Sequence, residues 1–314
     1  MERLEIFLVH PEVSWWNFTE VHRKRLQEAI PQAEVRVAHT ADEFAKALPE
    51  AETVVVWSFS QEWMDMAPKL KFIVTPAAGR DYFTVNPPAG VRIEYSSFHG
   101  RLIGETVCAM ILAENRGIAE GIDLQAQGMP WPKHELSVGM RLLSGSTALI
   151  LGFGHIGREI GRLLKAFGVQ IIGVKRTLSP SPDYFTASDR IVEVKRLHEV
   201  LPLADHLILA LPGDTGTDNI IGKAELSLLK PHVALYNIGR GNALDECALV
   251  DALKAQRLRA AWLDVFREEP LKKESPLRSC PTCRIFPHSS AIAPQYIDFF
   301  LDEFIPKYRN WHGL

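Results

Sequence analysis

Cysteine is scarce in this chain, and so are long apolar runs and any excess of one charge. Four cysteines in 314 residues are too few for the disulfide framework of a small secreted domain. No apolar run approaches the roughly 20 residues that a membrane helix needs. Because 35 Lys and Arg face 38 Asp and Glu, nothing favours nucleic acid or an anionic membrane as a partner. We therefore expect a cytoplasmic protein without nucleic-acid or membrane partners.

Two short segments need a separate interpretation. The N-terminus, MERLEIFLVHPE, lacks the apolar stretch and cleavage site of a signal peptide, and we expect it to form a first strand. Cys280 and Cys283 form a C-P-T-C motif, but a metal site would need two more ligands and no second pair lies nearby. A redox motif would open a helix, whereas this one precedes a short apolar run. We expect an incidental loop pair and no metal site.

The sequence alternates short Val- and Ile-rich runs with amphipathic segments, in two successive blocks. Such alternation predicts parallel sheets covered by helices on both faces. The first block has predicted strands at 4–9, 35–39, 53–58, 71–75 and 91–95, and helices at 18–30, 41–48 and 61–67. A longer helix is predicted over 100–118, then a polar, proline-broken loop over 125–136. The second block has predicted strands at 147–152, 169–174, 206–211, 233–238, 260–266 and 284–287, helices at 155–167, 196–204, 223–230 and 245–256, and a helical tail over 294–308.

The strongest local motif opens the second block. The segment LILGFGHIG follows apolar strand residues, opens a helix and places glycines at 152, 154 and 157. In a G-x-G-x-x-G turn the first glycine permits a tight turn, the second lets the backbone approach a pyrophosphate, and the third lets the helix pack on the strand. This context predicts a dinucleotide-binding turn rather than a merely glycine-rich one. Its cofactor-binding residues would be Gly152, Gly154, His155, Ile156 and Gly157.

The next predicted strand indicates which dinucleotide is bound. It ends in Lys175, Arg176 and Thr177, where NAD enzymes usually place an acid for the ribose 2′-hydroxyl. A basic pair would neutralise a 2′-phosphate through charge-assisted hydrogen bonds. We hypothesise that NADP(H) is favoured over NAD(H); a solvated basic loop is the alternative.

Three later segments each place a chemically useful side chain at or just after a strand end. They contribute Arg240, the acids Asp264, Glu268 and Glu269, and His288. The carboxyl ends of strands line the ligand crevice of an open α/β sheet, so these side chains are expected to converge. Arginine binds a carboxylate, histidine transfers a proton, and a neighbouring carboxylate orients the histidine. The combination predicts reduction of a keto acid, although each residue alone also fits a structural role.

These segments resemble the D-isomer-specific 2-hydroxyacid dehydrogenase family over nearly the whole sequence. The resemblance rests on LSGSTALILGFGHIG, LALPGDTGTDNIIG, LYNIGRGNALDECALVDAL, AAWLDVFREEPL and PHSSA. Within the family the sequence most resembles bacterial glyoxylate/hydroxypyruvate reductases of the A type, which also carry Arg-Thr after the second strand. The resemblance implies two doubly wound parallel-sheet α/β domains. A Rossmann cofactor domain, residues 100–292, would be inserted into a flavodoxin-like substrate domain, residues 1–99 and 293–314.

The resemblance also implies roles for single residues. Arg240 would bind the substrate's carboxylate and carbonyl oxygen, and Glu269 would pair with His288, the general acid and base. Asp264 would touch the carboxamide side of the nicotinamide. The cofactor cleft would further be lined by Leu211, Pro212, Thr217, Ile238 and Gly239. A homodimer is implied as well, with the helix over 100–118 and the following loop at its interface.

One segment departs from the family pattern. The family usually has Ala/Gly-Gly-Val-Asp after the fourth strand, with backbone N–H groups that hold the substrate carboxylate. This sequence reads PAAGRDYF, with Arg80 in the valine position. Ala78 and Gly79 can keep the backbone role. Arg80 either points to solvent, which we favour, or adds a positive charge for a second carboxylate or a phosphate on the substrate.

The favoured function is NAD(P)H-dependent reduction of a small 2-keto acid, of the glyoxylate/hydroxypyruvate type, to the D-2-hydroxy acid. Alternatives within the superfamily are phosphoglycerate and formate dehydrogenases, and D-2-hydroxyacid dehydrogenases for aromatic or branched substrates. The sequence's end at Leu314 argues against the longer phosphoglycerate enzymes, and the Glu–His pair argues against formate oxidation. A nicotinamide-sensing corepressor-like scaffold is the alternative from another class. The sequence leaves open whether four aromatic residues line the substrate pocket or the core: Trp57, Phe59, Trp63 and Tyr82.

Overall fold

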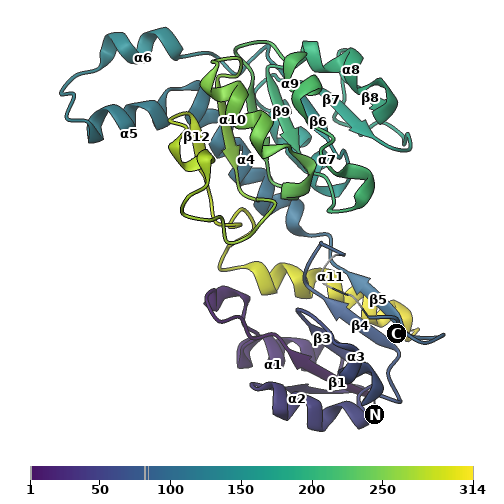
Figure 1. The fold of residues 1–314 in the computed structure, drawn as a ribbon. Helices are drawn as coiled ribbons and strands as arrows, with labels where there is room; N and C mark the ends of the chain where they lie inside the picture. The colour runs from purple at the N-terminus through teal and green to yellow at the C-terminus, as the bar shows by residue number, and fades with distance from the viewer. Residues whose placement is uncertain (1, 81–82, 84, 314) are drawn as a thin grey trace. The chain divides into compact units, whose positions relative to one another are not determined.

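The computed structural model describes residues 2–80, 83 and 85–313. The polypeptide forms two compact units, one made of Met1–His99 with Ala291–Leu314 and the other of Gly100–Ser290. Figure 1 shows that each unit is a sheet flanked by helices. The polypeptide leaves the first unit, builds the whole second unit and returns with its last helix. The second boundary lies two residues before the position expected from the sequence.

The first unit is built on a five-stranded parallel sheet in the order β2-β1-β3-β4-β5. This is the order of a flavodoxin-like doubly wound sheet. Every residue of β3 and β4 is buried, as expected for central strands that helices cover on both faces. The strands are β1 (Glu2–Phe7), β2 (Ala33–Val37), β3 (Thr53–Val56), β4 (Phe72–Thr75) and β5 (Arg92–Tyr95).

Four α-helices cover this sheet, and one of them comes from the far end of the sequence. They are α1 (Glu20–Ala29), α2 (Ala41–Ala47), α3 (Gln61–Asp65) and α11 (Tyr296–Trp311). The side chains of Thr40 and Ser60 cap α2 and α3 by accepting backbone N–H bonds, which such short helices need. Arg25 of α1 pairs with Asp298 and Asp302 of α11, so the returning helix is fastened to the first unit.

The second unit carries a seven-stranded parallel sheet in the order β12-β11-β10-β9-β6-β7-β8. Strand β6 has β7 on one side and β9 on the other, so the strand order reverses there. In doubly wound sheets a dinucleotide binds at the carboxyl end of this reversal. The strands are β6 (Thr147–Leu151), β7 (Gln170–Lys175), β8 (Arg190–Glu193), β9 (His206–Leu209), β10 (Ala234–Asn237), β11 (Ala260–Leu263) and β12 (Cys283–Ile285).

The helices of the second unit correct the loop that we expected over 125–136. The end of α5 and the start of α6 lie inside that range, and Figure 1 shows both helices extending away from the sheet. Pro132 precedes α6 at the N-cap, where a missing N–H costs nothing, so this proline starts a helix instead of breaking one. The helices are α4 (His99–Asn115), α5 (Ile118–Ala126), α6 (Lys133–Gly139), α7 (His155–Lys165), α8 (Leu197–Val200), α9 (Lys223–Ser227) and α10 (Glu246–Lys254).

Two further details differ from the sequence-based expectation. The long helix α4 ends at Asn115 rather than at 118, because Gly117 adopts a left-handed conformation with φ +65° that ends a helix. Strand β8 was not predicted: it is a four-residue edge strand with one buried residue, and it has no apolar run to mark it. In the described part of the chain, no helix is both long and apolar enough to cross a membrane.

Candidate functional site

The carboxyl ends of the parallel strands in the second unit meet at one edge of the sheet. Six of these strands have a residue singled out in the sequence at their end or just after it. They are Gly152 after β6, Lys175 ending β7, Leu211 after β9, Arg240 after β10, Asp264 after β11 and His288 after β12. The candidate site therefore lies where the strands of this one sheet have their carboxyl ends.

The glycine turn after β6 is packed at two glycines and open at the third. A Cβ atom on Gly152, whose φ is +93°, would lie 2.4 Å from the carbonyl oxygen of Ala210, and one on Gly157 would lie 2.6 Å from that of Gly152. A Cβ on Gly154 would meet nothing within 4 Å. Helix α7, which starts here, has no side-chain cap and no acid in its first turn. The residues present fit a pyrophosphate, because a helix N-terminus without a side-chain cap begins beside a glycine that has open space around it.

Cationic side chains gather after β7. Lys175 Nζ and Arg158 Nη2 both donate to Ser179 Oγ, at 2.9 and 2.8 Å. Arg176 is 75% exposed and lies 3.5 Å from Asp214 Oδ2, and Thr177 is exposed. Arg158 was not among the residues predicted from the sequence, although it directly follows the last glycine of the motif. It faces the basic strand end from the first turn of α7.

Arg240 is placed by the two glycines that flank it. A Cβ on Gly239 would lie 2.6 Å from the backbone of Leu211, and one on Gly241 would lie 1.9 Å from the carbonyl carbon of Phe266. Only glycine therefore lets the end of β10 fit between the segments that follow β9 and β11. The half-buried guanidinium donates from Nη1 to the carbonyl of Gly239 at 2.9 Å, which directs it along this edge.

Glu269 and His288, which follow adjacent strands, form a hydrogen-bonded pair. Nδ1 of His288 lies 2.8 Å from Oε2 of Glu269, with the side chains 38% and 36% exposed. Oε1 of Glu269 accepts from the Phe266 amide at 2.9 Å. Burial raises the pKa of Glu269, but the bonds from His288 and Phe266 and the charge of Arg240 outweigh it and hold that pKa below its ordinary value. An ionised Glu269 engages Nδ1 of His288, whereas Nε2 has no protein partner among the described residues.

Asp264 has a backbone-anchoring role that the sequence analysis missed. Its side chain is buried, and its two oxygens accept from the amides of Ser289 at 2.7 Å and Ser290 at 3.0 Å. The carbonyl of Asp264 also accepts from the amide of His288 at 2.9 Å. Asp264 thus holds the turn that carries the histidine. A contact with the nicotinamide stays a prediction.

The remaining residues predicted for the cofactor cleft differ in how far they are buried. Thr217 is buried and donates its hydroxyl to the carbonyls of Pro212 and Asp214, both at 2.8 Å. Ile238 is buried, Leu211 is half-buried and Pro212 is exposed. Thr217 and Ile238 therefore shape the segments after β9 and β10, and the Thr217 hydroxyl is already engaged within the protein.

The residues predicted for substrate binding lie in the first unit, after β4. Ala78 is exposed, Gly79 half-buried and Arg80 exposed. The Arg80 guanidinium lies 5.5 Å from the ring centre of Tyr95, within cation–π range. Whether Arg80 points to solvent or toward a substrate stays a prediction.

The sequence left open whether four aromatic residues line the core or the substrate pocket. Phe59 and Trp63 pack against Phe44, with ring centres 6.4 and 5.0 Å away, and belong to the core. Trp57 is half-buried and tilted against Trp16 at 5.7 Å. Tyr82 lies outside the described residues. Core packing therefore accounts for two of the four side chains.

Cys280 lies in the turn before β12, and Cys283 is the first residue of that strand. The amide of Cys283 donates to the carbonyl of Cys280 at 3.0 Å, and both thiols are free. Burial raises the pKa of Cys283 to about 12, so this thiol stays protonated and unreactive. In residues 2–80, 83 and 85–313, no three His, Cys, Asp or Glu side chains gather as metal ligands.

Comparison with known proteins identifies the family. The family model for the D-isomer specific 2-hydroxyacid dehydrogenase NAD binding domain matches residues 108–290. The chain belongs to this family. This dehydrogenase-family protein is 32% identical over 238 residues to the glyoxylate reductase of Thermococcus gammatolerans, a match that covers 72% of this chain and 69% of the relative. It is 29% identical over 273 residues to the D-3-phosphoglycerate dehydrogenase of Methanocaldococcus jannaschii, a match that covers 85% of this chain and 51% of the relative.

Solved structures support the same assignment. A D-isomer specific 2-hydroxyacid dehydrogenase family protein from Aeromonas salmonicida superposes with a TM-score of 0.82 at 27% identity, covering 100% of this chain and 97% of that one. The predicted family, the two-domain α/β fold and a nicotinamide dinucleotide site are thereby confirmed. The chain spans about half the length of the phosphoglycerate dehydrogenases that it matches. The matched relatives differ in substrate, so the substrate is a matter for proposal.

The glycine packing yields a prediction about stability. Gly241→Ala should lower the free energy of unfolding by about 1–3 kcal/mol or more, because the new methyl group must displace the Phe266 backbone. Gly154→Ala is the matched control and should change stability by less than about 1 kcal/mol, because its methyl group meets no protein atom. Urea unfolding of both variants measures the difference. Equal losses in the two would contradict the packing described for Arg240.

Proposed function

We propose that this family member reduces a small 2-keto acid of the glyoxylate/hydroxypyruvate type to the D-2-hydroxy acid, with NADPH as the preferred reductant. One observation carries the proposal: Arg240, Glu269 and His288 follow three neighbouring strands on the edge that also carries the glycine turn. A guanidinium and a carboxylate-oriented imidazole are the groups that a keto-acid reduction needs.

Each of the three residues has a distinct task in this reaction. Arg240 holds the substrate carboxylate and polarises the carbonyl oxygen. His288 donates a proton from Nε2 to that oxygen, and Glu269 keeps Nδ1 engaged so that the other ring nitrogen meets the substrate. When bound, NADPH supplies the hydride that the carbonyl carbon takes up. In the reverse direction His288 accepts the hydroxyl proton as a general base.

The basic cluster after β7 supports the cofactor preference. Lys175 and Arg158 converge on Ser179, and Arg176 directly follows Lys175. A 2′-phosphate at this position would receive charge-assisted hydrogen bonds, which are about twice as strong as neutral ones. The pair of Arg176 with Asp214 is exposed, and such pairs contribute little, so it offers weak competition for the phosphate.

The first unit would supply the contacts to the substrate. We infer that backbone N–H groups at Ala78 and Gly79 hold the substrate carboxylate, as the family resemblance implies. Arg80 lies over the ring of Tyr95, which supports a substrate without a second anionic group. A panel containing glyoxylate, hydroxypyruvate, pyruvate, phenylpyruvate, 2-oxoglutarate and 3-phosphohydroxypyruvate separates this class from the aromatic and phosphorylated alternatives. Negligible turnover of the whole panel would favour a sensing scaffold.

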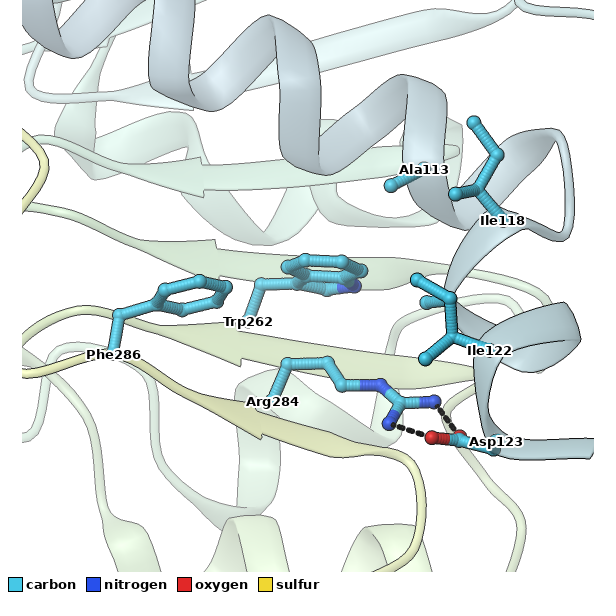
Figure 2. A pocket seen from close by; sticks show the side chains of 8 residues that line it. Ala113, Ile118, Ile122, Asp123, Trp262, Arg284 and Phe286 are labelled. Carbon is cyan, nitrogen blue, oxygen red and sulfur yellow. Dashed lines mark hydrogen bonds and ion pairs between the residues drawn. The ribbon is translucent and has the colours of Figure 1, made fainter. Parts of the chain in front are cut away.

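An apolar groove in the second unit supports a homodimer. Ile118 and Ile122 of α5 line a groove of about 260 Å³ together with Trp262 and Phe286. Figure 2 shows the isoleucines on one side and the two aromatic rings on the other. Ile118 and Ile122 are 53% and 62% exposed, and the helical extension carries two further exposed apolar residues, Trp131 at 83% and Val138 at 74%.

We infer that a second copy of this protein covers that surface. Exposed apolar patches of this kind mark interaction sites. The groove and the projecting apolar helices belong to one polypeptide, so two copies related by a two-fold axis can each fill the groove of the other. The bidentate ion pair between Arg284 and Asp123, dashed in Figure 2, fixes α5 beside β12 and keeps the groove formed.

The catalytic assignment predicts the effect of two substitutions. Arg240→Ala and His288→Ala should each lower kcat/KM for glyoxylate by on the order of 10²-fold or more, because each removes a group that acts on the carbonyl oxygen. The rate of NADPH oxidation at saturating cofactor measures the effect. His198→Ala is the matched control: His198 also pairs with a glutamate, Glu225 at 2.7 Å, but away from the site. Near-normal turnover of either test variant would refute the roles.

The cofactor assignment predicts a shift in preference. Wild-type protein should show a higher kcat/KM with NADPH than with NADH, and Lys175→Ala with Arg176→Ala should reduce that ratio by about tenfold or more, since charged hydrogen bonds contribute about 1.5–3 kcal/mol each. Lys254→Ala removes an exposed charge from α10 and should leave the ratio unchanged. A wild-type preference for NADH would refute the assignment of NADPH as the preferred cofactor.

The dimer proposal predicts a change in mass. Wild-type protein should sediment with twice the single-chain mass of 35.2 kDa, whereas Ile122→Asp, which buries a charge in the interface, should sediment as a monomer. Val21→Asp is the control, because Val21 is 74% exposed on α1 in the other unit. Sedimentation velocity at several concentrations distinguishes the species. A monomeric wild type, or a dimeric Ile122→Asp, would contradict the proposal.

A further inference from the structure

A second cavity, of about 300 Å³, lies at the opposite edge of the sheet in the second unit. Its lining includes Ser146 before β6, Asp205 before β9, His232 before β10 and Arg259 before β11. The cavity is thus formed at the amino ends of four neighbouring parallel strands, away from the edge that carries the glycine turn. Its volume is at the lower end of the range for small-ligand sites.

Two arginines line the cavity. Arg259 is held in place, because Nε lies 2.8 Å from Glu114 Oε1 and Nη2 donates to the Glu114 carbonyl at 2.7 Å. Its side chain is only 17% exposed. Arg141 is exposed, and its guanidinium has no partner among the described residues. One fixed and one available guanidinium at the same cavity favour an anion that can be bound by two arginines.

The one carboxylate in the lining is already neutralised. Asp205 accepts from the Thr147 amide at 2.8 Å, from Lys230 at 3.0 Å and from His232 Nε2 at 2.8 Å. Burial raises the pKa of Asp205, but these hydrogen bonds outweigh it and hold the pKa below its ordinary value. Its charge is therefore balanced by its own neighbours, and the surplus charge in the cavity is that of Arg141.

A buried histidine in the lining is only weakly hydrogen-bonded. His206 is 3% exposed, and its ring nitrogens lie 3.4 Å from Asn115 Nδ2 and 3.4 Å from the Tyr236 hydroxyl. These are long contacts for hydrogen bonds. Burial lowers the pKa of His206 to about 4, so the imidazole is neutral at physiological pH. Poorly bonded buried polar groups cost free energy, and a ligand in the cavity would relieve that cost.

We propose that this cavity binds a small metabolite bearing a phosphate or carboxylate group. Arg141 would supply the charge, Arg259 would supply a second guanidinium, and His206 with Asn115 would supply neutral hydrogen-bonding groups. Because the strands are parallel, this site and the glycine turn lie at opposite edges of one sheet. The proposal does not depend on the reaction proposed above, since none of its residues belongs to that machinery.

Titration calorimetry with inorganic phosphate and with malonate tests the proposal on the full-length protein. Wild-type protein should bind at least one of the two anions, and Arg141→Ala should weaken that binding by tenfold or more. Arg257→Ala is the matched control, because Arg257 is an exposed arginine two residues before Arg259 that does not line the cavity. It should bind as the wild type does. Tighter binding of phosphate assigns a phosphorylated ligand, and tighter binding of malonate assigns a carboxylate.

The position at which the anion binds is tested separately from its affinity. The ring signals of His206 and His232 in ¹⁵N–¹H spectra should shift on addition of the bound anion, and they should not shift in Arg141→Ala. Unliganded melting temperatures of the variants check that folding is intact. No binding of either anion by the wild type would overturn the proposal. Equal weakening in Arg141→Ala and Arg257→Ala, or binding without a change at these imidazoles, would overturn it as well.

Discussion

The candidate chemistry depends on two carboxylates that accept hydrogen bonds from backbone N–H groups. These N–H groups lie in the segments after the adjacent strands β11 and β12. Asp264 accepts from the amides of Ser289 and Ser290, and Glu269 accepts from the amide of Phe266. His288 itself has φ +52°, a conformation that costs free energy for a residue with a side chain. The bonds to Asp264 hold the residue there. Without them the imidazole would lose the position in which Nδ1 reaches Glu269.

Gly239 and Gly241, just after the neighbouring strand β10, also help to position these catalytic candidates. Because Gly241 touches the Phe266 backbone, the end of β10 determines where the segment holding Glu269 lies. Arg240, between Gly239 and Gly241, is therefore positioned by the contacts that also position the acid. Contacts between the segments after β10, β11 and β12 therefore fix the positions of Arg240, Glu269 and His288 together. This explains why an arginine between glycines is a stronger sequence signal than either residue type alone.

The sequence was informative where a local pattern determines structure and less so where distant segments meet. Alternating strands and helices predicted the fold class, because a parallel sheet needs crossovers. Strand β8 and helix α6 were missed, since one lacks an apolar run and the other follows prolines. The convergence of Arg158 and Lys175 on Ser179 joins a helix to a strand end, and no spacing encodes it. The pairing of Glu269 with His288 was expected from a family resemblance rather than from their separation in the sequence.

The two edges of the sheet in the second unit show why net charge is a poor guide to ligands. The formal charge of the protein is −3, yet both edges present cations. At the amino edge Asp205 is balanced by Lys230, and Arg259 by Glu114, which leaves Arg141 in surplus. At the carboxyl edge the surplus comes from Lys175 and Arg158, whose acceptor is a neutral hydroxyl. What attracts an anion is the charge left after local pairing, because exposed pairs farther away are screened within a Debye length of about 8 Å. A parallel sheet gathers strand ends at two edges, so a single domain can offer two separate anion sites while the whole protein remains acidic.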